Sequence, residues 1–109
     1  MAKNITKCDI CIVGAGLVGQ TAAIALARQG YEVILCAPAK NNKDNRTTAL
    51  LMDSVDYLNS LELWDQISQN AYPLKTMRIV DGSERMIRAP QTDFNSSEID
   101  LDAFGYNVQ

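Results

Sequence analysis

Two short apolar runs and a helical segment between them dominate the first part of the chain. Residues 8–13 are almost continuously apolar, and so are residues 32–37, which Pro38 ends. Such runs are typical of parallel strands that are covered on both faces. Residues 17–29 have a helical composition, and Gly30 stands where a left-handed residue often ends a helix. The order strand, helix, strand predicts a right-handed βαβ unit with neighbouring parallel strands.

The pattern changes after the second strand. Residues 39–48 are polar and are expected to form a loop. Apolar positions at helical spacing then predict a helix that Asp53 caps, with Val55, Leu58 and Leu61 on its inner side. A second short helical turn is expected at Leu63, Trp64 and Ile67.

A hairpin is expected in the last third of the chain. Apolar and polar residues alternate over residues 74–80, and Asp81 and Gly82 then form a turn signal. Residues 85–89 can pair back as the second strand of this hairpin, and the polar residues 91–100 are expected to form a loop. The predicted fold class is therefore α/β, with a βαβ start followed by a helix and a β-hairpin.

Length, charge and hydropathy limit the number of domains, the class of partner and the expected location. A chain of 109 residues forms at most one small domain, and a dinucleotide-binding fold with a substrate site usually needs more, so we expect a piece of a longer protein. The net charge of −3 and the lack of a Lys/Arg run disfavour a nucleic-acid partner. No apolar stretch approaches membrane-spanning length, and no signal peptide is evident, so a cytoplasmic location is expected.

The chain contains three cysteines and no histidine. Cys8 and Cys11 have a C-x-x-C spacing, which in other settings marks a redox or zinc site. Residues three apart in a strand point to opposite faces, and no second pair of ligands accompanies these two. We therefore interpret Cys8 and Cys11 as plain buried strand cysteines. The lack of histidine excludes Ser-His-Asp triads and histidine-bound metals from this chain.

A G-x-G-x-x-G motif joins the first strand to the helix and is expected to bind a pyrophosphate. Gly14 allows the tight turn, Gly16 lets a phosphate approach the backbone, and Gly19 lets the helix pack closely. Backbone N–H groups and the helix dipole then bind the anion. A strand before the motif, a helix after it and a second strand at the right distance make the signal specific. We call the motif the glycine loop; it consists of Gly14, Ala15, Gly16, Leu17, Val18 and Gly19.

Two further positions bear on the adenosine ribose. The motif expects an acidic residue at the end of the second strand, but Ala37 and Pro38 stand there, and Glu32 lies at the opposite end. Arg46 follows by a short polar loop and is either a ligand of the pyrophosphate or ribose, through fork-like hydrogen bonds, or a solvated loop arginine.

Several segments together resemble one enzyme family. They are Cys8–Gly19, Asp44–Leu51, Ser54–Val55, Leu58, Leu63–Asp65, Pro73–Asp81 and Phe104–Asn107. In this order they are similar to the ubiquinone-biosynthesis (2-polyprenylphenol) hydroxylases, which belong with the p-hydroxybenzoate-hydroxylase-like FAD-dependent monooxygenases. The resemblance runs along nearly the whole chain and covers only the first part of the family's length.

The resemblance implies a Rossmann-like FAD/NAD(P)-binding domain, of which residues 1–109 would be an incomplete N-terminal part. FAD would bind the glycine loop by its ADP half, NAD(P)H would reduce the flavin, and oxygen would then hydroxylate a phenol ring. Arg46 matches the family's arginine that reaches the FAD phosphate or ribose, and Ala37 stands where many members carry Glu. The later flavin motifs and the substrate region are absent, so the fragment alone is expected to be inactive.

Three interpretations follow. The first is the FAD-binding part of an aromatic hydroxylase that acts on a polyprenylphenol, with peripheral association with the inner membrane through the lipid substrate as an alternative to a purely cytoplasmic location. The second is a non-catalytic or truncated nucleotide-binding module. The third is a fragment of an NAD-linked oxidoreductase, which Arg46 and the lack of an acid at Ala37 disfavour. The oligomeric state stays open.

Overall fold

The structure is a computed structural model that describes residues 5–39 and 46–109. It divides into two compact units, Met1–Asp44 and Asn45–Gln109. The first unit contains the predicted βαβ segment, and the second contains the remaining strands and helices. The two units are described separately below.

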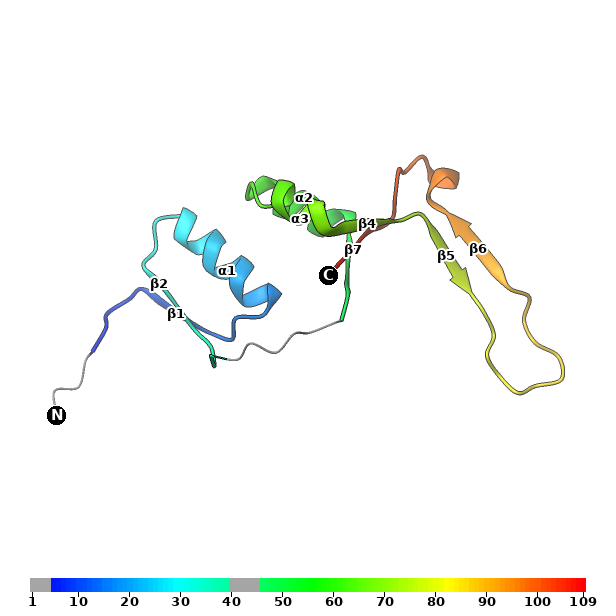
Figure 1. Cartoon of the computed structure of the whole chain (residues 1–109), viewed down its shortest axis with the longest axis horizontal. Coiled ribbons are helices and arrows are strands. Elements are labelled where there is room, and N and C mark those ends of the chain that lie inside the picture. Colours follow the sequence, from blue (N-terminus) through cyan, green and yellow to red (C-terminus); the bar gives the residue numbers. More distant parts are fainter. Residues whose placement is uncertain (1–4, 40–45) are drawn as a thin grey trace. The chain divides into compact units, whose positions relative to one another are not determined.

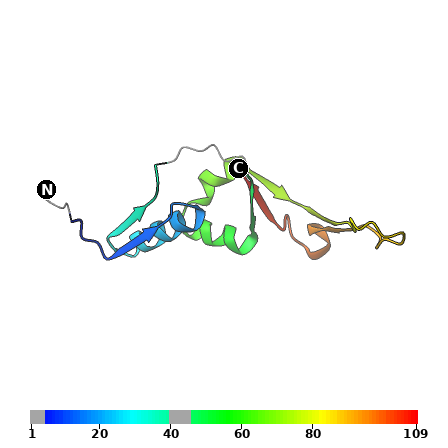
Figure 2. The ribbon, with the colours of Figure 1, turned by 90° about the horizontal axis from the view of Figure 1, so that it is seen from below.

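The first unit is a βαβ arrangement, as predicted. β1 (Ile10–Val13) leads into α1 (Leu17–Arg28), which runs back alongside the strands to β2 (Val33–Cys36) (Figure 1 and Figure 2). The two strands pair in parallel, from Ile10 opposite Val33 to Val13 opposite Cys36. Gly30, with φ of +93°, follows the end of the helix in the expected left-handed conformation.

Asp9 ties the amino ends of the two strands together. Its backbone N–H donates to the carbonyl of Glu32 at 2.9 Å, and its carboxylate accepts a hydrogen bond from the N–H of Glu32 at 2.8 Å. Glu32 therefore lies at the amino end of the strand pair, as expected, and away from the glycine loop at the other end.

The second unit is built on a three-stranded antiparallel sheet. β7 (Gly105–Val108) is its central strand, with β3 (Thr48–Leu51) on one side and β4 (Ala71–Leu74) on the other. The expected loop over residues 39–48 extends one residue too far, because its last residue, Thr48, is the first residue of β3. Residues 40–45 of this expected loop lie outside the described part of the chain.

Three helical segments connect β3 to β4: α2 (Met52–Ser60), α3 (Trp64–Ile67) and the 3₁₀ helix η1 (Ser68–Asn70). The two predicted helices are therefore confirmed. The expected cap is wrong, because Leu51 occupies the cap position of α2 and no side chain caps the helix. Asp53 lies inside the first turn, where its charge interacts favourably with the helix dipole.

The apolar core of the second unit lies between α2, α3 and β7. Val55 and Leu58 of α2 are buried, as is Ala103 just before β7. The rings of Trp64 and Tyr106 meet edge to face, with centroids 5.1 Å apart. Since aromatic pairs in this geometry add to the free energy of burial, this contact helps to hold α3 against β7.

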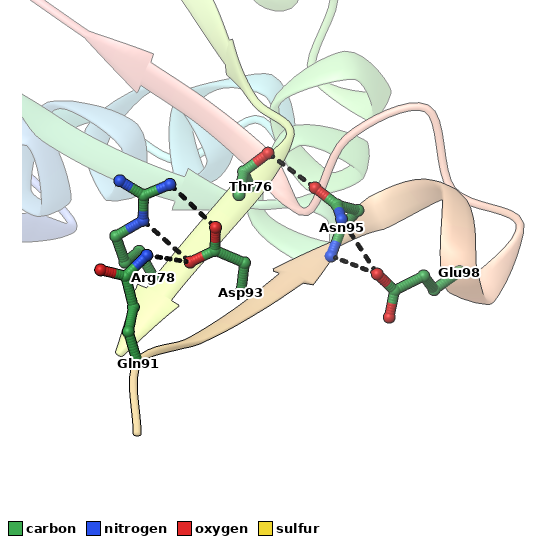
Figure 3. A network of polar contacts seen from close by, with 6 residues as sticks. All are labelled: Thr76, Arg78, Gln91, Asp93, Asn95 and Glu98. Carbon is green, nitrogen blue, oxygen red and sulfur yellow. Dashed lines mark hydrogen bonds and ion pairs between the residues drawn. The ribbon is translucent and has the colours of Figure 1, made fainter. Parts of the chain in front are cut away.

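The hairpin exists, but its second strand lies later in the sequence than expected. β5 (Thr76–Ile79) pairs with β6 (Thr92–Asn95), so residues 85–89 are not a strand and residues 91–100 are not simply a loop. Arg78 donates two hydrogen bonds of 2.8 Å to its cross-strand partner Asp93 (Figure 3). This charge-assisted pair favours the observed register.

The 3₁₀ helix η2 (Ser96–Ile99) follows β6 directly. Asn95 and Glu98 form a reciprocal capping box at its start, part of which Figure 3 shows. Ser96 is buried; its N–H donates to the carbonyl of Lys75 at 2.9 Å, and its hydroxyl donates to that of Asp102 at 3.3 Å. The polar residues after β6 are thus ordered by local hydrogen bonds.

Replacing Leu58, which is 5% exposed, by Ala tests this placement of the core. We expect the free energy of unfolding to fall by about 2–4 kcal/mol, because the truncation leaves a cavity among packed neighbours. Urea unfolding followed by the fluorescence of Trp64 measures the change. Asn59→Ala, at the next and exposed position of α2, is the control and should cost less than about 0.5 kcal/mol. Equal losses in both variants would contradict the assignment.

Candidate cofactor site

The glycine loop lies at the carboxyl edge of the β1–β2 pair. The N–H of Gly14 donates to the carbonyl of Cys36 at 2.8 Å, so the loop starts beside the last residue of β2. Ala37 and Pro38 follow Cys36 and therefore leave the sheet at the same edge. The structure thus brings these two residues and the glycine loop together, which is the edge where parallel α/β sheets bind ligands.

Two glycines of the loop are required by the fold itself. Gly14 has φ of +110°, a conformation that L side chains rarely adopt. At Gly19, a Cβ atom would collide with the carbonyl oxygen of Gly14 and lie 3.1 Å from its carbonyl carbon. The first turn of α1 can therefore approach the loop only because residue 19 has no side chain.

The fold does not explain the third glycine. Gly16 precedes α1 with φ of −74°, which other residues adopt readily, and a Cβ atom built there has no heavy atom within 4 Å. Its lack of a side chain leaves open space next to the start of the helix. A bound phosphate would need close access of this kind to backbone N–H groups, so the role of Gly16 towards a pyrophosphate stays a prediction.

The start of α1 presents such groups. Its first backbone hydrogen bond runs from the N–H of Gln20 to the carbonyl of Gly16, at 2.9 Å. The preceding N–H groups, those of Leu17, Val18 and Gly19, have no acceptor within the helix, and no side chain caps this end. The helix dipole places partial positive charge at the same point, and the first turn carries no acidic residue to compete with an anion.

Gln20 contacts the glycine loop, although no motif in the sequence selects it. Its side-chain amide donates to the carbonyl of Ala15 at 2.7 Å. Because the peptide group is planar, holding this carbonyl also fixes the direction of the N–H of Gly16 on the other side of the same bond. Gln20 is therefore a positioning residue for the glycine loop.

Arg46 belongs to the other compact unit. It is exposed and lies two residues before β3, in the second unit, whereas the glycine loop, Ala37 and Pro38 belong to the first. Its role towards a cofactor stays a prediction that rests on the resemblance. Ala37 is exposed and its methyl group offers no hydrogen bond to a ribose.

The expectation that Cys8 and Cys11 are buried strand cysteines is wrong. Cys8 is half-buried and precedes β1, while Cys11 and Cys36 are exposed. The sulfur atoms of Cys11 and Cys36 lie 3.9 Å apart, and this thiol contact raises the pKa of Cys11. The C-x-x-C pair is thus not the one brought together. Over residues 5–39 and 46–109, no group of three or more metal-binding side chains is found.

Comparison with known families identifies the fold. The sequence matches the FAD-binding-domain family over residues 7–106. The chain belongs to this family. The match bears out the predicted Rossmann-like α/β fold and identifies FAD as the cofactor of the domain.

Two curated relatives are ubiquinone-related hydroxylases. The ubiquinone hydroxylase UbiL of Rhodospirillum rubrum is 35% identical over 80 residues, a match that covers 68% of this chain and 19% of the relative. The 3-demethoxyubiquinol 3-hydroxylase of Escherichia coli is 28% identical over 109 residues, covering 93% of this chain and 27% of the relative. The predicted resemblance to ubiquinone-biosynthesis hydroxylases is thereby confirmed, and the chain spans less than a third of either protein.

A solved structure agrees in fold. The p-nitrophenol 4-monooxygenase of Pseudomonas putida superimposes with a TM-score of 0.65 at 20% identity, over 91% of this chain and 25% of that one. Its likeness supports the fold alone. No helix in the described part of the chain is long and apolar enough to cross a membrane.

Stability measurements can distinguish Gly19, which the fold requires, from Gly16, which it does not. Gly19→Ala should lower the free energy of unfolding of the first unit by about 2–3 kcal/mol, because the new methyl group must displace the Gly14 backbone. Gly16→Ala should cost less than about 1 kcal/mol, since only the cap preference changes. Far-UV circular dichroism during urea unfolding measures both. A Gly16 variant as unstable as the Gly19 variant would show that the fold needs both glycines.

Proposed function

We propose that this chain is the FAD-binding portion of a flavin monooxygenase that hydroxylates an aromatic ubiquinone precursor with NAD(P)H and oxygen. The observation that carries the proposal is the family match over residues 7–106, which includes a glycine loop with open space at Gly16. A generic nucleotide-binding module would be expected to match the family only around the glycine loop, whereas this match extends to residue 106. The same match disfavours a fragment of an NAD-linked oxidoreductase.

The glycine loop would hold the pyrophosphate of FAD. The N–H groups at the start of α1 would donate to the phosphate oxygens, and Gln20 would keep the Ala15–Gly16 peptide in the required orientation. Arg46 would add a charge-assisted contact to the phosphate or ribose. The bound flavin supplies the hydride acceptor and the oxygen chemistry, while the protein orients it.

The substrate is proposed from the relatives, whose names specify ubiquinone and demethoxyubiquinol. We propose an aromatic ring of the polyprenylphenol type, bound in a part of a longer protein that this chain does not include. A cytoplasmic location, with peripheral contact to the inner membrane through the lipid substrate, accompanies this proposal. Within that longer protein the chain would contribute the site for the ADP half of FAD, whereas alone it would bind FAD weakly or not at all and would be inactive.

The proposal predicts that the longer protein purifies with bound FAD, visible as a flavin absorbance band. It should oxidise NAD(P)H in a manner stimulated by a prenylated phenol and yield a hydroxylated ring, identified by mass spectrometry. Gly16→Val should lose FAD because the side chain fills the phosphate space. A colourless protein whose spectrum does not respond to added FAD would refute the cofactor assignment, whereas a yellow protein inactive on phenols would refute only the substrate.

Replacing Ala37 by Glu tests how the ribose is held. The carboxylate would stand at the carboxyl end of β2, beside the glycine loop, where it can accept hydrogen bonds from the ribose hydroxyls. We expect FAD to bind about tenfold more tightly to the longer protein, the gain of one hydrogen bond to a charged group. Ala37→Leu, which adds bulk without charge, is the control. No difference between the variants in fluorescence titration would place the ribose elsewhere.

A further inference from the structure

The loop that closes the β5–β6 hairpin, residues 80–91, exposes two large apolar side chains at its centre. We call it the tip loop; it joins the ends of the two strands (Figure 1). Met86 is 102% exposed and Ile87 is 87% exposed, the highest values among the large apolar residues that the structure describes. Two adjacent apolar side chains at the end of a hairpin are available to a surface that would cover them.

The base of the tip loop is closed by its own hydrogen bonds. The carboxylate of Asp81 accepts from the N–H of Ser83 at 2.9 Å and from the N–H of Ala89 at 3.0 Å. These bonds bracket residues 84–88 between two fixed points, as in a compact surface loop. Below them, the Arg78–Asp93 pair clamps the strands. Met86 and Ile87 are therefore presented at the end of a closed loop.

Charge indicates what covers this pair. Arg85 and Arg88 flank it directly and are exposed, in a chain whose net charge is −3. The acidic groups nearby are largely engaged: Asp81 by backbone N–H groups and Asp93 by Arg78. Residues 84–88 contain Glu84, Arg85 and Arg88 and so carry a net positive charge, which the carboxylate of Asp81 balances over the tip loop as a whole. Apolar residues between cations match the boundary between anionic lipid headgroups and acyl chains.

We propose that the tip loop is a membrane-docking element for an anionic bilayer. Met86 and Ile87 would enter the acyl boundary, and Arg85 and Arg88 would bind the lipid phosphates. With one apolar pair and two cations, the attachment would be weak and reversible. The proposal goes beyond the proposed function and does not depend on it, because it uses neither the glycine loop nor a substrate.

Co-sedimentation of this chain with lipid vesicles tests the apolar pair. We expect partition onto phosphatidylcholine vesicles that contain about 30% phosphatidylglycerol and little onto phosphatidylcholine alone. Met86→Ser combined with Ile87→Ser should weaken partition about tenfold or more, because the buried apolar area is lost. Ile99→Ser, at an exposed apolar position of η2, is the matched control and should bind like the parent. Failure of the parent to bind, or equal binding by the double variant, would overturn the proposal.

Replacing Arg85 and Arg88 by Gln tests the charge. Each loss should weaken binding to anionic vesicles about fivefold and reduce its salt dependence. Lys75→Gln, an exposed cation outside the loop, should have no such effect. Equal effects of the lysine and the arginine replacements would indicate non-specific charge attraction and would overturn the assignment to this loop.

Tryptophan fluorescence can report directly whether the tip loop enters the bilayer, because the signal depends on where the tryptophan is placed. Met86→Trp should give a blue-shifted emission on vesicles and should be quenched by brominated acyl chains, whereas Ile99→Trp should not. Trp64, which contacts Tyr106, contributes the same background in both variants. Circular dichroism verifies that each variant retains the parental fold. Quenching at residue 99 equal to that at residue 86 would show that the tip loop does not enter the bilayer.

Discussion

The close approach of α1 to its own preceding loop is the constraint on which the first unit depends. The missing side chain at Gly19 lets the first turn of the helix rest against the Gly14 carbonyl, and the Gly14 N–H joins the end of β2. One tight turn thereby connects strand, helix and neighbouring strand. The free N–H groups of the helix start consequently lie at the carboxyl edge of the sheet, where the open space at Gly16 would admit a ligand.

The first unit was predictable from sequence because this constraint, like the strands and the helix, is encoded by residues close together in the chain. Residues 8–37 specify a βαβ unit through local signals: two apolar runs, a helical composition and glycines at defined spacing. The boundaries shifted by only a few residues, since β1 begins at Ile10 rather than at Cys8. Gln20 was not predicted because its role depends on a hydrogen bond from its side chain to the carbonyl of Ala15. No residue spacing in the sequence indicates this contact.

The second unit was harder to predict because its pairings are non-local. A turn signal at Asp81 suggested a short hairpin, but the Asp81 carboxylate instead brackets a long loop, and the Arg78–Asp93 pair favours a later register. Similarly, the position of β7 is set by its pairing with β3 and β4, which both lie far earlier in the sequence. No periodicity within residues 105–108 could specify those neighbours. The predicted helix cap is wrong for a local reason: Asp53 has a suitable side chain, but the cap position falls two residues earlier, at Leu51.

The absence of an acid at Ala37 has a consequence for how the domain would recognise its cofactor. A carboxylate at the end of β2 distinguishes a ribose from other groups, because its acceptors match two neighbouring hydroxyls. With a methyl group there, recognition by the first unit rests on backbone N–H groups and the helix dipole, which respond to negative charge rather than to the sugar. The glycine loop would then be chiefly a phosphate-binding element, and selection of FAD over other phosphorylated ligands would fall to residues outside it, of which Arg46 is the predicted one within this chain.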